Sequence, residues 1–424
     1  MKEILNEVYE KSVDILKKNS TSLGLRAATT GDKKVMEGYG KLWARDAFFA
    51  SIGYNMLQDE KLLEVSKHTL DTFAKARNIL GAIPNNYDQR TGVAGYHFAG
   101  SVDASSLYII SLASLYYFTR DKRLLKEDLD AALGAYVWLR YRDVNDTMLV
   151  NSPPTAEWMD TMIRIYDHTL YNNVLFYLAT NSINWLCEES GKALKREYKI
   201  NEEDLKKRIN EVFYPLKENR QKIFLYWKRL AESKAFNKLN DMGFYLNFIS
   251  PNIIDSHFDT LSNTLCVLSG LADDNLSKRI LSFIVDKKLD QPYPVKSLYP
   301  PYKYNENFVL SKKINDTMPV YWNSTAYNYH NGGIWPFIGG FYELALIKSN
   351  SSKKDTTLHK LAELNQVSRY RNGVGFNEWL NGKSGKPIGQ EGHSWNAGLY
   401  IAAYLYAKEG KNPFGFLNAR RRFL

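Results

Sequence analysis

The chain has 424 residues, enough for one to three domains of ordinary size. Its 56 Lys and Arg outnumber its 46 Asp and Glu by ten, and the two signs are mostly interspersed, which argues against a nucleic-acid-binding protein. No stretch approaches the roughly 20 apolar residues of a membrane span, and the N-terminus lacks the apolar core of a secretion signal. We therefore expect a cytoplasmic protein with no membrane partner, in which Cys187 and Cys266 are buried, reduced thiols.

Apolar residues recur at spacings of three and four along almost the whole chain, a pattern that predicts helices and few strands. Long segments without this periodicity, at 81–102, 288–334 and 371–392, are polar and rich in aromatic residues, which is typical of ordered functional loops. No flexible linker divides the chain, so residues 1–424 are predicted to form a single catalytic domain. The predicted helices lie near residues 2–18, 45–57, 60–79, 103–119, 123–142, 168–188, 201–214, 256–271, 275–287, 335–348, 354–370 and 393–409.

The twelve predicted helices alternate in character. Every second helix is apolar on most sides and carries small residues, as in DASSLYIISLASLYYF (103–118), whereas the others, such as DEKLLEVSKHTLDTFAKAR (59–77), are amphipathic. Inner helices buried on most sides and outer helices with one wet face would produce this contrast. The predicted fold is therefore all-α, an (α/α)6 toroid of six helix pairs with long irregular loops at its mouth; an open solenoid would need a fixed-period repeat, which we do not find.

The chemically unusual residues cluster just before, or at the start of, the inner helices. Because all inner helices of an alternating ring point the same way, these segments are expected to meet at one mouth. An aromatic content of 14%, with 29 Tyr and 9 Trp, suits a sugar-binding cleft there. The segments are LWARDAFF (42–49), YHFAGSVDAS (96–105), PTAEWMD with DH (154–168), DSHFDT (255–260), YHNGGIWP (329–336) and GQEGHSW (389–395).

In these segments the sequence resembles the inverting glycoside hydrolases that fold as a barrel of six helix pairs. The group includes the amylo-1,6-glucosidase domain of glycogen debranching enzymes, neutral and alkaline invertases, trehalases, processing α-glucosidases and mannosylglycerate hydrolases. The matches run in order from about residue 40 to 410. LWARDAFFASIG is similar to the group's "RD" segment, FAGSVDASS to "VDA", EWMDTM to "TWMDA", YHNGGIWP to the invertases' "YHNGGSWP", and FNEWLNGKSGKPIGQEGHSW to the terminal "EY/EW…QxW" segment.

The resemblance implies that Asp160 is the general acid and Glu378 the general base. An inverting pair must flank the sugar, with about 6.5–9.5 Å between the carboxyl groups to admit a water molecule. Glu157 and Asp160 would share one helical turn and could not flank anything, whereas Asp160 and Glu378 could face each other across a closed ring. Asp160 needs a dry setting to hold a proton, which the adjacent Trp158 could supply, and Glu378 should stay ionised.

Several of these assignments leave an alternative open. Asp160 could be only a first-turn acid, Glu378 a loop salt-bridge partner, and Glu391 is the rival base. Glu157 could bind substrate, support Asp160 or be a plain helix-start carboxylate.

Other predicted substrate-binding residues follow from the same segments. By resemblance Arg45 and Asp46 bind sugar hydroxyls, although neighbouring Arg and Asp are often structural; Asp103 is either a sugar contact or a helix N-cap. Aromatic and turn residues complete the predicted substrate-binding set, with sugar contact weighed against core packing for the tryptophans and with His393 also at the last helix start. The full set is Trp43, Arg45, Asp46, Asp103, Glu157, Trp158, His330, Asn331, Gly332, Trp335, Glu391 and Trp395.

No cofactor is expected. The sequence has no HxxxH, HExxH or CxxC spacing for a transition metal, and no GxxxxGK or GxGxxG for a nucleotide, although a Ca²⁺ ion held by oxygen ligands stays open.

The resemblance implies an exo-acting inverting glycoside hydrolase that cleaves a terminal α-linked glucose, in the manner of an amylo-1,6-glucosidase, from an oligosaccharide or small glycoside. The alternatives are an invertase-like (sucrose) or mannosylglycerate-hydrolase-like specificity, epimerase or lyase chemistry on the same fold, and a non-enzymatic sugar-binding toroid. The oligomeric state is not predicted.

Overall fold

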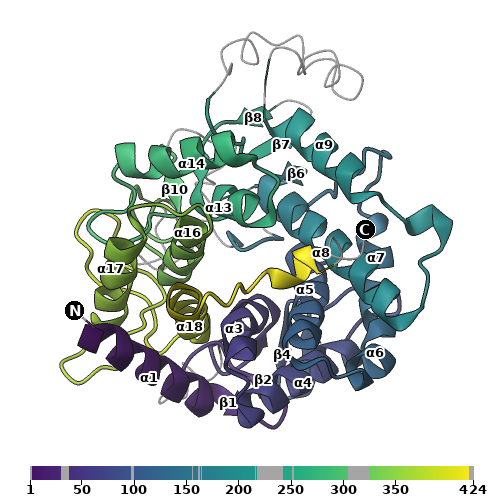
Figure 1. Cartoon of the computed structure of the whole chain (residues 1–424), viewed down its shortest axis with the longest axis horizontal. Coiled ribbons are helices and arrows are strands. Elements are labelled where there is room, and N and C mark those ends of the chain that lie inside the picture. The colour runs from purple at the N-terminus through teal and green to yellow at the C-terminus, as the bar shows by residue number, and fades with distance from the viewer. Residues whose placement is uncertain are drawn as a thin grey trace.

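The computed structural model describes residues 2–29, 38–96, 100–154, 156–160, 163, 165–214, 216, 242–250, 253–303 and 325–419. Within these ranges the protein is a double ring of helices, seen along its axis in Figure 1. Each inner helix is adjacent in sequence to outer ones, so the chain alternates between the two rings. The inner helices are α3 (Ala44–Leu57), α5 (Val102–Thr119), α8 (Leu170–Ser190), α13 (Thr260–Ser269), α16 (Pro336–Lys348) and α18 (Ser394–Glu409). The outer helices are α1 (Lys2–Asn19), α4 (Glu60–Lys75), α6 (Arg123–Glu127), α7 (Leu129–Arg140), α9 (Glu202–Phe213), α14 (Asp274–Asp286) and α17 (Lys354–Gln366).

The inner ring closes because each inner helix packs against the next and α18 packs against α3. This last contact is close: a Cβ atom added to Gly53 in α3 would lie only 1.7 Å from the carbonyl oxygen of Gly398 in α18. Small residues on these helices therefore serve helix packing, and α1 completes the outer ring by packing on α17 and α18. The predicted all-α toroid is confirmed.

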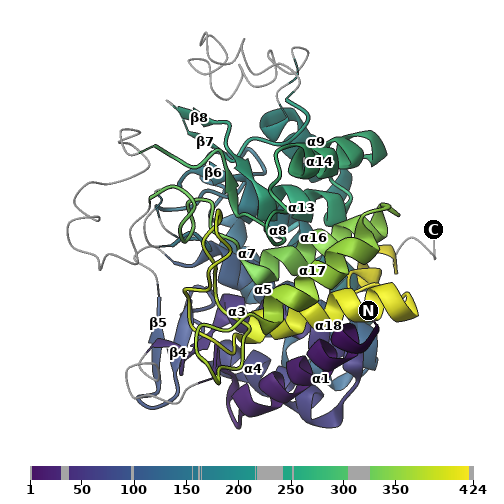
Figure 2. The same cartoon turned by 90° about the vertical axis from the view of Figure 1, so that its left-hand side faces the viewer.

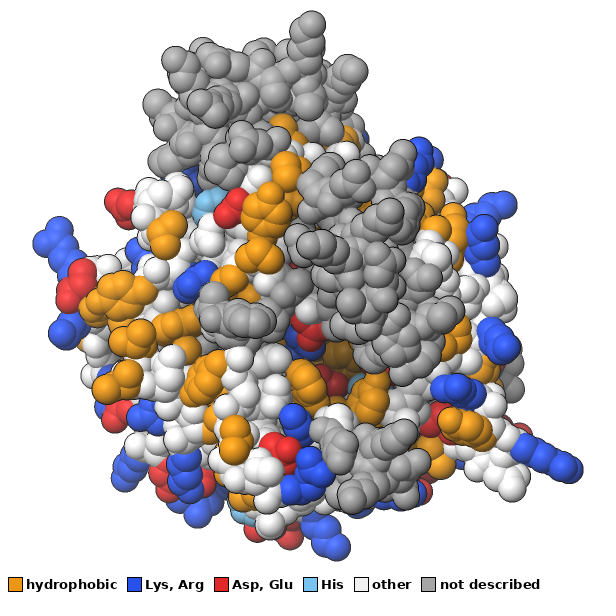
Figure 3. Space-filling model, turned by 180° about the vertical axis from the view of Figure 1, so that it is seen from behind, with side chains coloured by type: hydrophobic (Ala, Val, Ile, Leu, Met, Phe, Trp, Pro, Cys, Tyr) orange, Lys and Arg blue, Asp and Glu red, His pale blue; other side chains and the backbone are white. Residues whose placement is uncertain are grey.

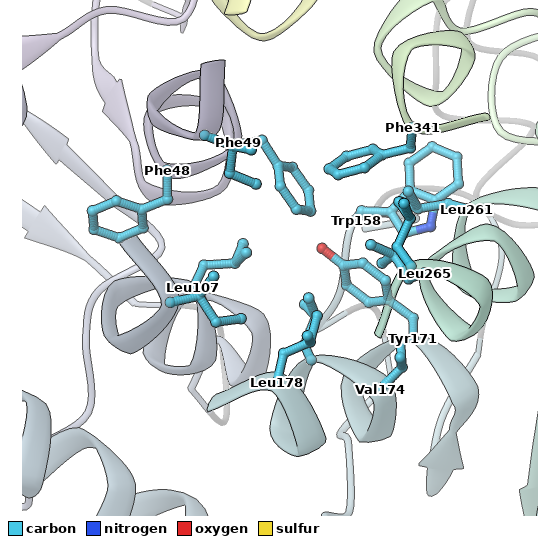
Figure 4. Close-up of a cluster of buried hydrophobic side chains, with 14 of the residues drawn as sticks. Phe48, Phe49, Leu107, Trp158, Tyr171, Val174, Leu178, Leu261, Leu265 and Phe341 are labelled. Carbon is cyan, nitrogen blue, oxygen red and sulfur yellow. The ribbon is translucent and has the colours of Figure 1, made fainter. Parts of the chain in front are cut away.

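Apolar side chains of the inner helices fill the middle of the ring. Figure 4 shows Phe49, Leu107, Leu178, Leu261 and Phe341 directed towards one another from five inner helices. All are buried, so burial of apolar surface holds the ring together from within.

Short strands gather at one end of the helices, on the left of Figure 2. They form antiparallel sheets with the orders β3-β4-β5, β6-β7-β8 and β10-β9, and the β1-β2 hairpin follows α1. The last described segment, with the 3-10 turn η4 (Gly415–Asn418), contacts α5 and α8 and crosses the other end of the ring in Figure 1. The strands are β1 (Ser20–Thr21), β2 (Gly24–Leu25), β3 (Leu42–Trp43), β4 (Asn86–Asp88), β5 (Val93–Gly95), β6 (His168–Thr169), β7 (Phe248–Ser250), β8 (Ile253–Asp255), β9 (Phe258–Asp259) and β10 (Leu298–Tyr299).

The predicted helix positions need three corrections. The helix expected at 123–142 is two helices, α6 and α7, separated at Asp128. The helix expected from residue 256 begins at Thr260, because β9 precedes it and Asp259 caps it by accepting the backbone N–H of Leu261. The segment at Glu157–Asp160 is irregular rather than the first turn of a helix, since α8 begins only at Leu170.

Parts of the predicted loops and of the C-terminus are not described by the structure. Residues 304–324 of the expected loop at 288–334 lie outside the described residues, as do the last residues of the basic C-terminus, 420–424.

Cys187 and Cys266 are buried and free, and burial raises the pKa of both thiols. None of the helices in the described ranges is long and apolar enough to cross a membrane.

Candidate active site

A cavity of about 240 Å³ lies where the N-terminal ends of three inner helices, α3, α16 and α18, meet the loops before α8 and α18. The face seen in Figure 3 is hollowed near its centre, where acidic, basic and hydrophobic side chains gather. Nine of the fourteen predicted site residues line this cavity, so the expected convergence on one mouth is confirmed for them. They are Trp43, Arg45, Asp46, Trp158, Asp160, His330, Trp335, Glu378 and Trp395; the rest of the wall is Ala27, Gly38, Tyr39, Tyr329 and His393.

Arg45 fixes Asp160 on the cavity wall. Arg45 lies in the first turn of α3, and its Nη2 donates to Asp160 Oδ2 at 3.0 Å, while its Nη1 donates to the backbone oxygen of Glu157 at 3.2 Å. Asp160 keeps 18% of its side chain exposed, beside the buried Trp158. The setting of Asp160 is thus partly dry, as expected, and it also contains the Arg45 cation.

Asp103 supports Arg45 from behind the cavity. It is fully buried, and its Oδ2 accepts from Arg45 Nη1 at 3.2 Å and from the Tyr171 hydroxyl at 3.3 Å. Burial alone would lower the pKa of Arg45, yet the carboxylates of Asp160 and Asp103 hold it above its usual value. Asp103 is not the N-cap of α5, which is Ser101, and it does not line the cavity. Its position makes it a positioning residue for Arg45.

Glu378 lies on the same cavity wall as Asp160, in the loop between α17 and α18. Its Oε2 accepts from the Tyr39 hydroxyl at 2.8 Å, and its backbone N–H donates to the Gln390 oxygen at 2.8 Å. Burial raises the pKa of Glu378 to about 7, against the hydrogen bond from Tyr39, and repulsion from Asp46 and Asp160 adds to the rise. A carboxylate with a pKa near 7 is poised to act as a base at neutral pH.

A third carboxyl group, Asp46, also faces the cavity. Burial raises its pKa to about 7, while Arg45 opposes the rise. Its Oδ1 lies 3.7 Å from His393 Nδ1, beyond hydrogen-bonding distance. Burial lowers the pKa of His393 to about 3, so this imidazole is neutral at physiological pH.

Several polar atoms on the cavity wall are buried and unpaired in the described part of the chain. They are Trp158 Nε1, Trp395 Nε1, His330 Nδ1 and both ring nitrogens of His393. Buried donors and acceptors without partners are costly, so native proteins rarely keep them unless a ligand or water satisfies them. Trp335 differs, because its Nε1 donates to the Tyr329 oxygen at 3.0 Å, and it therefore offers only its ring to a ligand. The wall thus combines aromatic surface with convergent polar atoms.

Glu157 does not reach the cavity. Its side chain is 2% exposed and neither carboxylate oxygen has a hydrogen-bond partner among the described residues. Burial raises the pKa of Glu157 well above its usual value, and Asp259 and Asp103 add to the effect. The interpretation as a helix-start carboxylate is wrong, because the segment is irregular, and the side chain does not line the cavity. The Glu157 backbone oxygen accepts from Arg45 Nη1 and so helps to hold the partner of Asp160.

Three other predicted residues have structural partners instead. Glu391 accepts from the Ser368 hydroxyl and from the backbone N–H groups of Arg369 and Val374, at 2.6, 2.6 and 2.9 Å, so its carboxylate organises the loop after α17. The Asn331 side chain bonds the backbone of Tyr302. Gly332 turns the chain at a φ of 88° beneath Pro301. None of the three lines the cavity.

Tyr39 and Tyr329 line the cavity but are not among the residues predicted from the sequence. Tyr329 is the first residue of the YHNGGIWP segment, and its position beside His330 was a usable signal. Tyr39 has no such signal, because only the folded chain brings it to Glu378. A search of the described ranges finds no group of three or more His, Cys, Asp or Glu that could hold a metal ion.

Comparison with known families decides what kind of protein carries this site. Residues 55–413 match the family described as alkaline and neutral invertase. The chain belongs to this family. It is therefore a glycoside hydrolase with a carbohydrate substrate, as the resemblance of its motifs indicated.

Individual relatives are distant. The chain is 23% identical to probable alkaline/neutral invertase A of Arabidopsis thaliana, a match that covers 95% of this chain and 70% of the relative. It is 28% identical over 168 residues to cytosolic invertase 1 of Oryza sativa subsp. japonica, covering 39% of this chain and 28% of the relative. Against probable invertase F of Arabidopsis thaliana the chain spans about half of the relative's length, 52%.

Solved structures share the fold of this invertase-family chain. A mannosylglycerate hydrolase from Thermus thermophilus in complex with glucose aligns with a TM-score of 0.61 at 14% identity, over 93% of this chain and 99% of its own. A bacterial glucoamylase complexed with acarbose aligns with a TM-score of 0.58 at 15% identity, over 97% of this chain and 57% of its own. At these identities the likeness concerns the six-hairpin glycosidase fold alone.

Proposed function

We propose that the protein hydrolyses sucrose with inversion at the anomeric carbon of glucose. The observation that carries the proposal is that Asp160 and Glu378, more than two hundred residues apart, line one cavity. Its wall also includes residues with indole and imidazole nitrogens that have no partner in the described part of the chain, those of Trp158, Trp395, His330 and His393. At about 240 Å³ the cavity is sized for the glucose ring, and an adjoining cavity of about 380 Å³, which shares Tyr39, Tyr329 and Glu378 with it, leaves room for the fructose ring. The unpaired indole and imidazole nitrogens would bond the glucose hydroxyls, and the tryptophan rings would cover the apolar face of the glucose.

In the proposed reaction, Asp160 donates its proton to the glycosidic oxygen as the bond from that oxygen to the anomeric carbon breaks. Glu378 takes a proton from a water molecule as the water oxygen bonds the anomeric carbon from the opposite face, giving β-glucose and fructose. Asp160 is ion-paired with Arg45, so in the proposed reaction docking of the leaving oxygen loosens this pair before Asp160 donates its proton. Exclusion of water by the bound sugar also helps Asp160 to hold its proton.

Family membership supports sucrose over the α-1,6-linked glucoside that the debranching-enzyme motifs suggested. Both substrates carry a terminal α-linked glucose, so the glucose-binding residues would be shared and the leaving group would differ. The single catalytic domain spanning residues 1–424 stays a proposal, supported by the packing of α1 on α17 and α18. The relatives are named for chloroplasts, mitochondria and the cytosol, so a cytoplasmic location stays a prediction.

Product anomers followed by NMR test the proposal, with sucrose, isomaltose, maltose, trehalose and mannosylglycerate offered separately. We expect β-glucose to appear first, from sucrose. If α-glucose appears first, inversion is wrong; if only isomaltose or mannosylglycerate is cleaved, the mechanism stands and the sucrose assignment is wrong. Turnover must also disappear in Asp160→Asn and Glu378→Gln.

A further inference from the structure

A cavity of about 430 Å³ lies away from Asp160, beside the C-terminal end of α14. Three separate parts of the chain contribute basic side chains to it: Lys287 and Lys288 after α14, Lys296 before β10, and Lys383 in the turn that follows Glu378. No Asp or Glu is among its lining residues. Nothing in the proposed hydrolysis of sucrose uses this cavity.

The lysines outnumber the carboxylates near them. Asp286 ends α14 and Asp290 lies in the following loop, where its charge acts on Lys296. Among the described residues named here, four ammonium groups stand against two carboxylates, an excess of positive charge. A helix C-terminus attracts cations, which accounts for Lys287, Lys288 and Lys296, whose Nζ bonds the Lys288 oxygen, but not for Lys383.

Lys296 is the most informative of the four, because it is only 8% exposed. Its Nζ donates to the backbone oxygens of Lys288, at 2.8 Å, and Gln291. These two carbonyl oxygens accept hydrogen bonds from the Lys296 ammonium group but carry no full negative charge. No carboxylate of the described ranges forms an ion pair with Lys296. Burial lowers the pKa of Lys296, as expected for an ammonium group whose charge is poorly compensated.

Lys383 is held in place before any ligand binds. Its Nζ lies 4.8 Å from the centre of the Tyr327 ring, and its backbone N–H donates to Asn381 Oδ1 at 3.0 Å. The neighbouring Gly382 N–H donates to the Tyr327 oxygen at 2.8 Å. Preorganised charges lose less entropy on binding. Tyr299 and Tyr327 also line the cavity and provide ring surface beside the ammonium groups.

We propose that this cavity binds a phosphorylated small molecule, with its phosphate between Lys288, Lys296 and Lys383. A phosphate group carries up to two negative charges and accepts several charge-assisted hydrogen bonds, which suits several lysines better than one carboxylate would. The two tyrosine rings can pack against a sugar or a nucleobase.

Isothermal titration of the full chain with pyrophosphate, glucose 6-phosphate and AMP tests this proposal, with unphosphorylated glucose as the neutral comparison. Pyrophosphate reports the phosphate contacts alone, and the other two report whether a sugar or a base adds affinity. The test variant is Lys288→Gln with Lys383→Gln; the matched control is Lys61→Gln with Lys408→Gln, which removes the same charge from exposed positions on α4 and α18. We expect saturable binding of at least one phosphate, weakened about tenfold or more in the test variant and unchanged in the control.

Absence of saturable binding by all three phosphates overturns the proposal, as does equal weakening in both variants. Should the test variant fold poorly, lysine acetylation of the wild-type chain gives the second measurement. Pyrophosphate must then slow acetylation of Lys288 and Lys383 but not of Lys61; equal rates with and without pyrophosphate also overturn it. Titration of Asp160→Asn tests whether the phosphate binds in the catalytic cavity instead. We expect this variant to bind phosphate as tightly as the wild type does.

Discussion

The hydrogen bond from Tyr39 to Glu378 sets the ionisation of the proposed base, and Tyr39→Phe removes it. Burial raises the pKa of Glu378 to about 7, and the Tyr39 hydroxyl, 2.8 Å from Oε2, restrains that rise. A hydrogen bond to a charged group is worth about 1.5–3 kcal/mol, and one pKa unit corresponds to about 1.4 kcal/mol. The variant should therefore raise the pKa of Glu378 by about 1 to 2 units.

The sign of the activity change follows from the role of Glu378. A base works only when ionised, so activity falls as the pH drops through its pKa. With a pKa near 7, about half of the wild-type enzyme is ionised at pH 7; a rise of 1 to 2 units would leave about 9% to 1%. At pH 7 we expect kcat/KM to fall about fivefold to fiftyfold, with most of the loss recovered at higher pH.

The assay is the pH profile of kcat/KM on the substrate found by NMR, with circular dichroism at each pH. The matched control is Tyr136→Phe, which removes a hydroxyl bonded to Thr180 on α8 rather than to a carboxylate. The reasoning is refuted if the acidic limb of the Tyr39→Phe profile has the wild-type midpoint, or if Tyr136→Phe shifts that limb equally.

Three further outcomes follow from the same geometry. Asp160→Asn and Glu378→Gln should each lower kcat by about 10²–10⁴-fold while near-ultraviolet circular dichroism stays unchanged; a loss under tenfold would remove that residue from the chemistry. Arg45→Met leaves buried Asp103 without its cation and should cost about 3–5 kcal/mol in urea unfolding, where a loss below about 1 kcal/mol would contradict the ion-pair role. Burial raises the folded-state pKa of Glu157, so the wild type loses stability as the pH rises above the unfolded value towards the folded one. Glu157→Gln, which is neutral throughout, should match the wild type near pH 4 and exceed it increasingly towards pH 8, by up to about 1.4 kcal/mol per pH unit; parallel stability curves would show that Glu157 is ionised in the fold.

The sequence by itself determined the ring and the residues at its mouth. Periodic apolar spacing is a local property of the chain, so helices such as α5 and α16 could be predicted nearly to the residue, and their nearly all-round apolar surfaces marked them as inner helices. Directionality then predicted that Asp46, Asp160 and Trp395 would meet, because inner helices of an alternating chain all begin at the same end.

The tertiary structure alone decided which of those residues face the cavity. Glu157 and Asp160 are three residues apart, yet one is buried without a partner and the other lines the cavity, because the segment before α8 is irregular and has no helical face. Glu391 turns to the loop after α17 and Asp103 to Arg45, although their positions near the starts of inner helices had placed both among the predicted site residues. Such outcomes depend on contacts between residues far apart in sequence, and a local pattern does not encode the direction of a side chain in an irregular loop.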